Sequence, residues 1–154
     1  SVGSGKSYMA ACVANELIKQ GADVKMTNFA TVLNDLFNCE DKNEYIRSLC
    51  RYSLLILDDL GIERNTEYSL ENLFNVIDAR YVSGKAMIIT TNLNLEELKN
   101  QKQLSLKRIY DRVLERCIPV CVSENDFRKD NRVEAKVKFG KIINGGKMDE
   151  EKYE

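Results

Sequence analysis

The residues Ser1-Val2-Gly3-Ser4-Gly5-Lys6-Ser7 decide the fold, because they supply the last seven positions of the phosphate-binding pattern G-x-x-x-x-G-K-[ST]. Only the first glycine of the pattern is missing, and it would precede Ser1. Small residues let successive backbone N–H groups turn toward nucleotide phosphates, and Lys6 adds a positive charge at the β- and γ-phosphates. The Ser7 hydroxyl can reach Mg²⁺. The sequence therefore predicts a phosphate-binding loop.

The residues after this loop support the prediction, because residues 7–19 have the apolar spacing of a helix and Gly21 follows as a stop signal. A phosphate-binding loop normally follows a buried strand. No residues stand before Ser1 to form that strand, so we expect an N-terminally truncated sheet. The missing strand would lie between the strands expected at 86–91 and 118–122.

The composition is that of one globular domain, with 154 residues, 44% hydrophobic and 31% charged. A net charge of −1 provides no overall attraction to nucleic acid or to anionic membranes. No apolar run is long enough to span a membrane, and the five cysteines are scattered without C-x-x-C spacing. We therefore expect a cytoplasmic protein with reduced thiols and no membrane partner. Because histidine is absent, Ser-His and Cys-His nucleophiles are excluded.

Strand and helix signals alternate along the chain, which predicts an α/β fold with a parallel, doubly wound sheet. The residues expected to form strands are 24–27, 54–57, 86–91 and 118–122, the last at an edge because of Pro119. The expected helices after the first cover 29–37, 44–50, 66–82, 95–99 and 105–115. Residues 1–139 are expected to form a single domain, and the Gly/Lys/Glu-rich residues 140–154 a disordered tail.

Two carboxylates follow the continuous apolar run at 54–57. A strand of this kind is buried on both faces, and its carboxyl end is where parallel sheets bind ligands. Because successive side chains alternate in direction, we expect Asp58 to bind Mg²⁺ with Ser7 and Asp59 to orient or deprotonate a water near the γ-phosphate. The alternative is a solvated Asp-Asp turn before Gly61.

The strand expected at 86–91 ends in Thr90-Thr91-Asn92. Its carboxyl end should lie beside the two aspartates, where the Asn92 amide can bind the attacking water or the γ-phosphate. The alternative is that Asn92 only caps the helix beginning at Leu95. Asn94 fits that cap better, which leaves Asn92 for catalysis.

The motifs Ser-Val-Gly-Ser-Gly-Lys-Ser, Leu-Leu-Ile-Leu-Asp-Asp-Leu-Gly, Ile-Ile-Thr-Thr-Asn-Leu and Arg-Ile-Tyr-Asp-Arg-Val together resemble the ATPase domain of bacterial replicative helicase loaders of the DnaC/DnaI type. The related transposition ATPase IstB shares this set. The resemblance extends from Ser1 to about residue 132. It implies a P-loop NTPase of the AAA+ class that uses ATP and Mg²⁺ and assembles into homo-oligomeric rings or spirals on DNA.

By this resemblance, Asn92 corresponds to the sensor residue after the fourth strand and Arg112 to an arginine finger that reaches a neighbouring subunit's ATP. Arg128 matches a second sensor, although the family more often shows Gly-x-Ser-x-Arg there. The expected catalytic residues are Asp59, Asn92 and Arg112, and the expected metal ligands are Ser7 and Asp58. The expected nucleotide-binding residues are Val2, Gly3, Ser4, Gly5, Lys6, Ser7, Tyr8 and Arg128.

The arginines can also be interpreted from their chemistry alone, without the resemblance. An arginine suits γ-phosphate charge because its fork matches phosphate geometry and it stays protonated. Lys99, Lys102, Lys107, Arg108, Arg112 and Arg116 form a basic patch. This patch could contact DNA phosphates, or it could be a solvated helix face paired with its own acids.

The resemblance implies an ATPase that loads or remodels the replicative DNA helicase on single-stranded DNA. One alternative is an IstB-like ATPase that assists a transposase on duplex DNA, and another is a small-molecule P-loop kinase. A kinase would need an acceptor pocket and an arginine-bearing lid, and it does not call for Asp-Asp followed by Thr-Thr-Asn. A fourth possibility is that the isolated chain is a folded remnant that hydrolyses nothing by itself.

Overall fold

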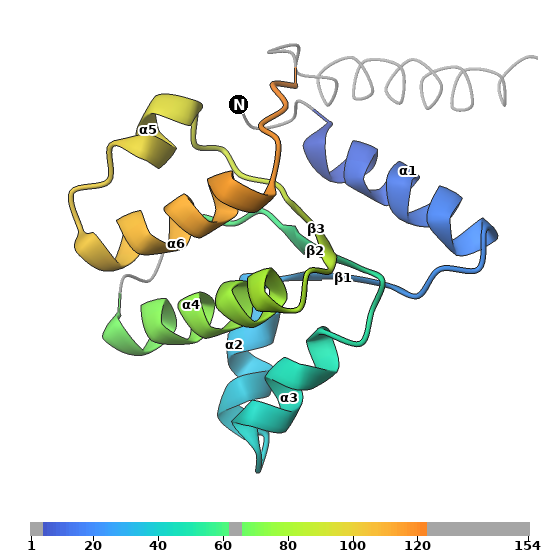
Figure 1. Ribbon diagram of the computed structural model, residues 1–154, viewed down its shortest axis with the longest axis horizontal. Coiled ribbons are helices and arrows are strands. Elements are labelled where there is room, and N and C mark those ends of the chain that lie inside the picture. The colour runs from blue at the N-terminus through green and yellow to red at the C-terminus, as the bar shows by residue number, and fades with distance from the viewer. Residues whose placement is uncertain (1–4, 62–65, 123–154) are drawn as a thin grey trace, which may run out of the picture. The chain divides into compact units, whose positions relative to one another are not determined.

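Three parallel strands in the order β1-β2-β3 form the sheet of this protein, which we describe from a computed structural model (Figure 1). The structure describes residues 5–61 and 66–122. The helices and strands within these ranges belong to the unit Lys6–Cys121, one of two units into which the chain divides. The strands are β1 (Val24–Asn28), β2 (Leu54–Asp58) and β3 (Ala86–Ile89). The helices are α1 (Lys6–Lys19), α2 (Phe29–Asn38), α3 (Lys42–Leu49), α4 (Glu67–Val82), α5 (Leu95–Lys99) and α6 (Leu104–Arg116).

The central strand β2 pairs with both neighbours in parallel, so the carboxyl ends of all three strands meet at one edge of the sheet. Asn28 stands opposite Asp58, and Leu57 stands opposite Ile89. This confirms the α/β class and the parallel sheet predicted from the alternating signals. The register also determines which polar residues, directly after the ends of neighbouring strands, lie next to one another.

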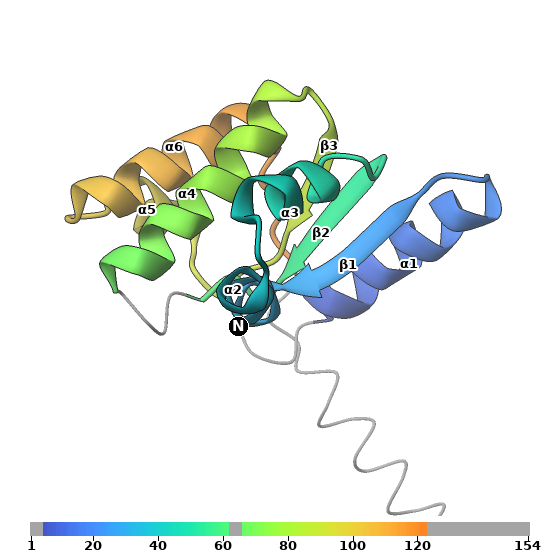
Figure 2. The ribbon, with the colours of Figure 1, turned by 90° about the horizontal axis from the view of Figure 1, so that it is seen from below.

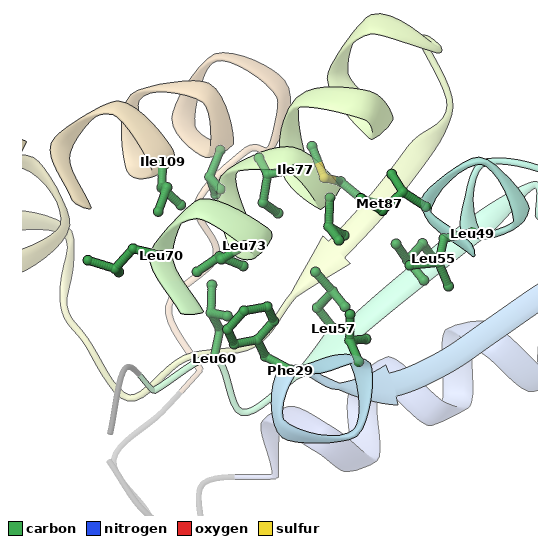
Figure 3. Packing of buried hydrophobic residues seen from close by; sticks show 14 of the residues in the cluster. Phe29, Leu49, Leu55, Leu57, Leu60, Leu70, Leu73, Ile77, Met87 and Ile109 are labelled. Carbon is green, nitrogen blue, oxygen red and sulfur yellow. The ribbon is translucent and has the colours of Figure 1, made fainter. Parts of the chain in front are cut away.

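Helices cover both faces of the sheet, which explains the continuous apolar run in β2 (Figure 2). Leu54 and Ile56 pack with α1 through Ala10 and Ala14. Leu55 and Leu57 point to the other face and join the larger cluster with α2, α3, α4 and α6, part of which Figure 3 shows. Small alanines on α1 let this helix approach the sheet closely, and it begins at Lys6.

Side-chain caps fix where several helices begin. Asn28 caps α2, Thr66 caps α4, and Asn94 forms a capping box with Glu97 at α5. The Asn94 cap confirms the reading that assigned this role to Asn94 and left Asn92 available. No helix in the described parts of the chain is both long and apolar enough to cross a bilayer.

Arg80 of α4 is fully buried, although arginine is rarely found in a core. Its guanidinium donates to the carbonyls of Leu49, Tyr52, Ser53 and Ala86 at 2.5–3.2 Å. Burial lowers the pKa of this guanidinium from its usual value. Arg80 therefore ties the end of α3 to the segments that lead into β2 and β3.

The strand expected at 118–122 is wrong: the chain has no regular structure there, and β3 ends at Ile89 rather than Thr91. Ile118 and Val120 are 89% and 72% exposed, and Pro119 has no N–H to donate. A strand needs a neighbouring backbone, and no backbone hydrogen bond joins the described residues 118–122 to β3. An apolar run alone therefore does not make a strand. The expected boundary at 139 and the tail at 140–154 lie outside the described residues.

Candidate functional site

The Thr90 hydroxyl joins the two aspartates at the carboxyl end of β2. It donates to Oδ1 of Asp58 at 2.7 Å and accepts from the backbone N–H of Asp59 at 2.7 Å. The backbones also pair, because the Leu60 N–H donates to the Thr90 carbonyl at 2.7 Å. The segment after β2 is thus held against the segment after β3.

The chain turns sharply at Asp59, which has a φ of 52° and lies in the left-handed region that few non-glycine residues adopt. The turn gives the two carboxylates different partners: Asp58 binds Thr90, whereas Oδ1 of Asp59 accepts from the Asn92 amide at 3.0 Å. Asp58 is half-buried and Asp59 is exposed. The two acids therefore differ in partner and exposure because of this turn rather than strand alternation, since β2 ends at Asp58, and their separate roles stay a prediction.

Lys6 contacts this group from the first residue of α1. Its ammonium donates to Oδ1 of Asn92 at 2.9 Å. Asn92 thereby accepts from the lysine and donates to Asp59, so a chain of hydrogen bonds runs from Lys6 through Asn92 to Asp59. The structure brings together four predicted site residues: Lys6, Asp58, Asp59 and Asn92.

The donor groups suit a nucleotide with Mg²⁺. An ammonium and the N–H groups of the first turn of α1 attract phosphate, and that turn carries no acidic residue to oppose it. Mg²⁺ is usually held by one or two protein oxygens plus phosphates and waters, which a carboxylate and a hydroxyl can supply. Ser7 and Tyr8 are exposed on this turn, Tyr8 at 76%.

Arg112 lies away from these residues, beside the end of α4 that leads into β3. Its Nε is 3.0 Å from Oδ1 of Asp78, in an ion pair that lacks the alignment of a hydrogen bond. Its guanidinium also lies 4.6 Å from the centre of the Tyr81 ring. Tyr81 precedes β3, whereas Asp58 follows the last apolar residue of β2, so the two groups lie toward opposite ends of the sheet.

Four predicted nucleotide-binding residues, Val2, Gly3, Ser4 and Arg128, lie outside the described residues. Gly5 is described and has a φ of 85°, a conformation that glycine adopts without strain. The roles of all these residues remain predictions.

Thr90 was not among the predicted site residues. Its contact with Asp58 follows from the parallel register of the structure, which pairs Leu57 with Ile89 and thereby makes the next residues, Asp58 and Thr90, neighbours. A buried hydroxyl directly beside a buried strand's terminal acid is a polar group that needs a partner.

Comparisons with known proteins agree with this fold. A family model described as IstB-like ATP binding protein matches residues 1–135. The chain is similar to the uncharacterized protein YdaV of Escherichia coli K12, with 35% identity over 115 residues, 72% of this chain and 45% of YdaV. It is 28% identical over 116 residues to the replicative helicase loader DnaC of the same strain, covering 72% of this chain and 46% of DnaC.

A solved structure of DnaI has the same fold, with a TM-score of 0.67 over 82% of this chain and 68% of that chain. Identity is 22%, so the likeness concerns the fold alone. The chain spans about half the length of the curated relatives it matches.

Proposed function

The chain belongs to the family of IstB-like ATP-binding proteins, and from this we propose that it hydrolyses ATP with Mg²⁺ to load or remodel a replicative DNA helicase on single-stranded DNA in the cytoplasm. The observation that carries the proposal is the chain of hydrogen bonds from Lys6 through Asn92 to Asp59. It joins a phosphate-binding cation, a polar amide and a carboxylate at the edge where parallel sheets bind ligands.

The residues divide the work of phosphoryl transfer, in which positioning and electrostatics supply most of the catalysis. The loop through Gly5, with Lys6 and the first turn of α1, binds the phosphates. Ser7 and Asp58 would hold Mg²⁺, which would neutralise phosphate charge when bound. Asp59 orients the attacking water and accepts its proton, and its carboxylate binds Asn92 rather than Thr90.

Nucleotide entry changes the partner of Lys6. Its ammonium binds the Asn92 oxygen in the present structure, and γ-phosphate oxygens are stronger acceptors because they are charged. When Lys6 moves to the phosphates, the Asn92 oxygen becomes available for the attacking water while its amide still donates to Asp59. Asn92 thus contacts the Asp59 carboxylate in both states, and the partner of its oxygen changes when the nucleotide binds.

The proposed arginine finger acts on a neighbouring subunit in a homo-oligomer. Arg112 contacts the end of α4 far from the residues around Asp59 of its own chain, so it is poorly placed to reach the ATP that its own Lys6 binds. Asp78 and Tyr81 contact its guanidinium, and the Arg112 side chain is about one third exposed. The other proposed arginine, Arg128, rests on the family resemblance alone.

The helicase partner is supported by the similarity to DnaC, whose name describes helicase loading. A second candidate is assistance to a transposase on duplex DNA. The match to the IstB-like family supports it as well as it supports helicase loading, because both functions use the same ATP-hydrolysing site. The two functions share the site and differ in partner and in the form of DNA. A small-molecule kinase has no specific observation in its favour.

The deciding experiment gives the full-length protein ATP, a replicative helicase of its host and single-stranded DNA circles. Helicase should transfer to the circles with the wild-type protein and not with Lys6→Ala. A protein that hydrolyses ATP but transfers no helicase, and instead binds a transposase on duplex DNA, would refute the loader function in favour of the second candidate.

A further inference from the structure

We propose that Thr90 is a positioning residue for catalysis, whose single hydroxyl sets the Mg²⁺-binding carboxylate of Asp58 and the backbone of Asp59 at the same time. The inference rests on the proposed function, since it names how that same site is assembled. It adds Thr90, the residue directly after β3, and assumes no contact between Thr90 and the nucleotide.

The geometry uses both capacities of a hydroxyl. Thr90 Oγ1 donates to Asp58 Oδ1 at 2.7 Å and accepts from the Asp59 N–H at 2.7 Å. The donated bond leaves the second oxygen of Asp58 for Mg²⁺ and fixes the rotation of the carboxylate. The accepted bond holds the Asp59 backbone at a φ of 52°. The single hydroxyl of Thr90 therefore fixes the positions of Asp58 and Asp59 relative to each other.

Water is a poor substitute for this hydroxyl, because Thr90 is only 7% exposed. A Thr90→Val variant keeps the shape of the side chain but can neither donate to Asp58 nor accept from Asp59. A Thr90→Ser variant keeps both functions. The pair therefore separates loss of the hydroxyl from loss of packing.

If the Thr90 hydroxyl only held the segments after β2 and β3 together, the hydroxyl of its neighbour Thr91 would do the same. The Thr91 hydroxyl also ties β3 to the segment after β2, donating to the Leu60 carbonyl at 2.8 Å, but it contacts neither aspartate. The backbone bond between Leu60 and Thr90 does not depend on either side chain. Thr91→Val is thus a matched control that removes a hydroxyl from the same junction.

The test compares the wild-type full-length protein with Thr90→Val, Thr90→Ser and Thr91→Val. The measurements are ATP turnover against Mg²⁺ concentration, affinity for ATP with and without Mg²⁺, and thermal unfolding. Loss of a hydrogen bond to a charged group corresponds to a decrease in rate of about tenfold to a hundredfold. We expect Thr90→Val to lower turnover by that factor, to require more Mg²⁺ for half-maximal turnover, and to bind ATP without Mg²⁺ normally. Thr90→Ser and Thr91→Val should stay within about threefold of wild type.

Turnover and Mg²⁺ response of Thr90→Val equal to those of Thr91→Val would overturn the assignment. If Thr90→Val unfolds at a lower temperature than Thr91→Val, Thr90→Ala provides a smaller second variant, and the same Mg²⁺ response is expected of it. Failure of the proposed function is seen separately, in the wild-type protein: without turnover, the Mg²⁺ dependence of ATP affinity still tests Thr90, and without ATP binding both inferences fall.

Discussion

Lys6 donates its 2.9 Å hydrogen bond to Asn92 across 86 positions of the chain, from the start of α1 to the loop after β3. The lysine that we propose to bind phosphate thus contacts the same amide that binds the proposed catalytic carboxylate of Asp59. In a protein that binds ATP, this contact must exchange for one to phosphate, so Asn92 should matter more for turnover than for binding.

Asn92→Ala should lower ATP turnover about a hundredfold, as loss of one positioned hydrogen-bond group does in other active sites. Affinity for ATP should change by only a few fold. Asn94→Ala is the matched control, because it removes a capping box and should cost about 1 kcal/mol of unfolding free energy. Turnover assays and thermal unfolding check both, and equal turnover of the two variants would contradict the role of Asn92.

Arg112→Ala should leave ATP binding by single subunits intact and remove the stimulation of turnover that accompanies assembly, an effect of up to about 10³–10⁵-fold where such fingers are known. Mixtures of Arg112→Ala and Lys6→Ala subunits should regain activity, because each lacks a different half of the shared site. Arg116→Ala, which loses a contact to the Gly84 carbonyl, is the control. Absence of recovery in confirmed mixed oligomers would show that Arg112 only packs against Tyr81 and Asp78.

Arg80→Met should strongly destabilise the protein, because four backbone carbonyls lose their buried donor. We expect a loss of about 3–5 kcal/mol in the free energy of unfolding, because each buried acceptor left without a donor costs about 1–3 kcal/mol. The exposed Arg51→Met should change it by less than about 0.5 kcal/mol. Chemical denaturation measures both, and similar values for the two would refute the structural role of Arg80.

Tyr110→Phe should preserve or raise stability, because the buried Tyr110 hydroxyl has no hydrogen-bond partner among the described residues. Burial raises the pKa of Tyr110 to about 12. Above the ordinary tyrosine pKa of about 10, the unfolded chain loses this proton while the folded chain keeps it, so stability falls as pH rises from 10 to 12. Tyr110→Phe should reduce that fall in denaturation curves across this range, and an unchanged slope would contradict the assignment.

Local sequence signals predicted the helices and strands well, because capping residues and apolar periodicity act within a few positions. Asn94 illustrates this with its capping box, and Leu54–Leu57 with its two buried faces. The strand prediction for residues 118–122 is wrong because strand formation depends on a neighbouring backbone, which an apolar run in the sequence does not report. The contact of Thr90 with Asp58 joins residues 32 positions apart, and only the strand register reveals it.

The central claim is that Lys6 is needed to bind ATP and that Asp59 is needed to hydrolyse it. One paired measurement on the full-length protein tests this claim most directly. Equilibrium titration with a fluorescent ATP analogue and turnover are measured for wild type, Lys6→Ala and Asp59→Asn in the presence of Mg²⁺. We predict that Lys6→Ala abolishes binding and that Asp59→Asn binds as wild type does while hydrolysis stops. Turnover by Asp59→Asn at the wild-type rate, or undiminished ATP affinity of Lys6→Ala, would contradict the account.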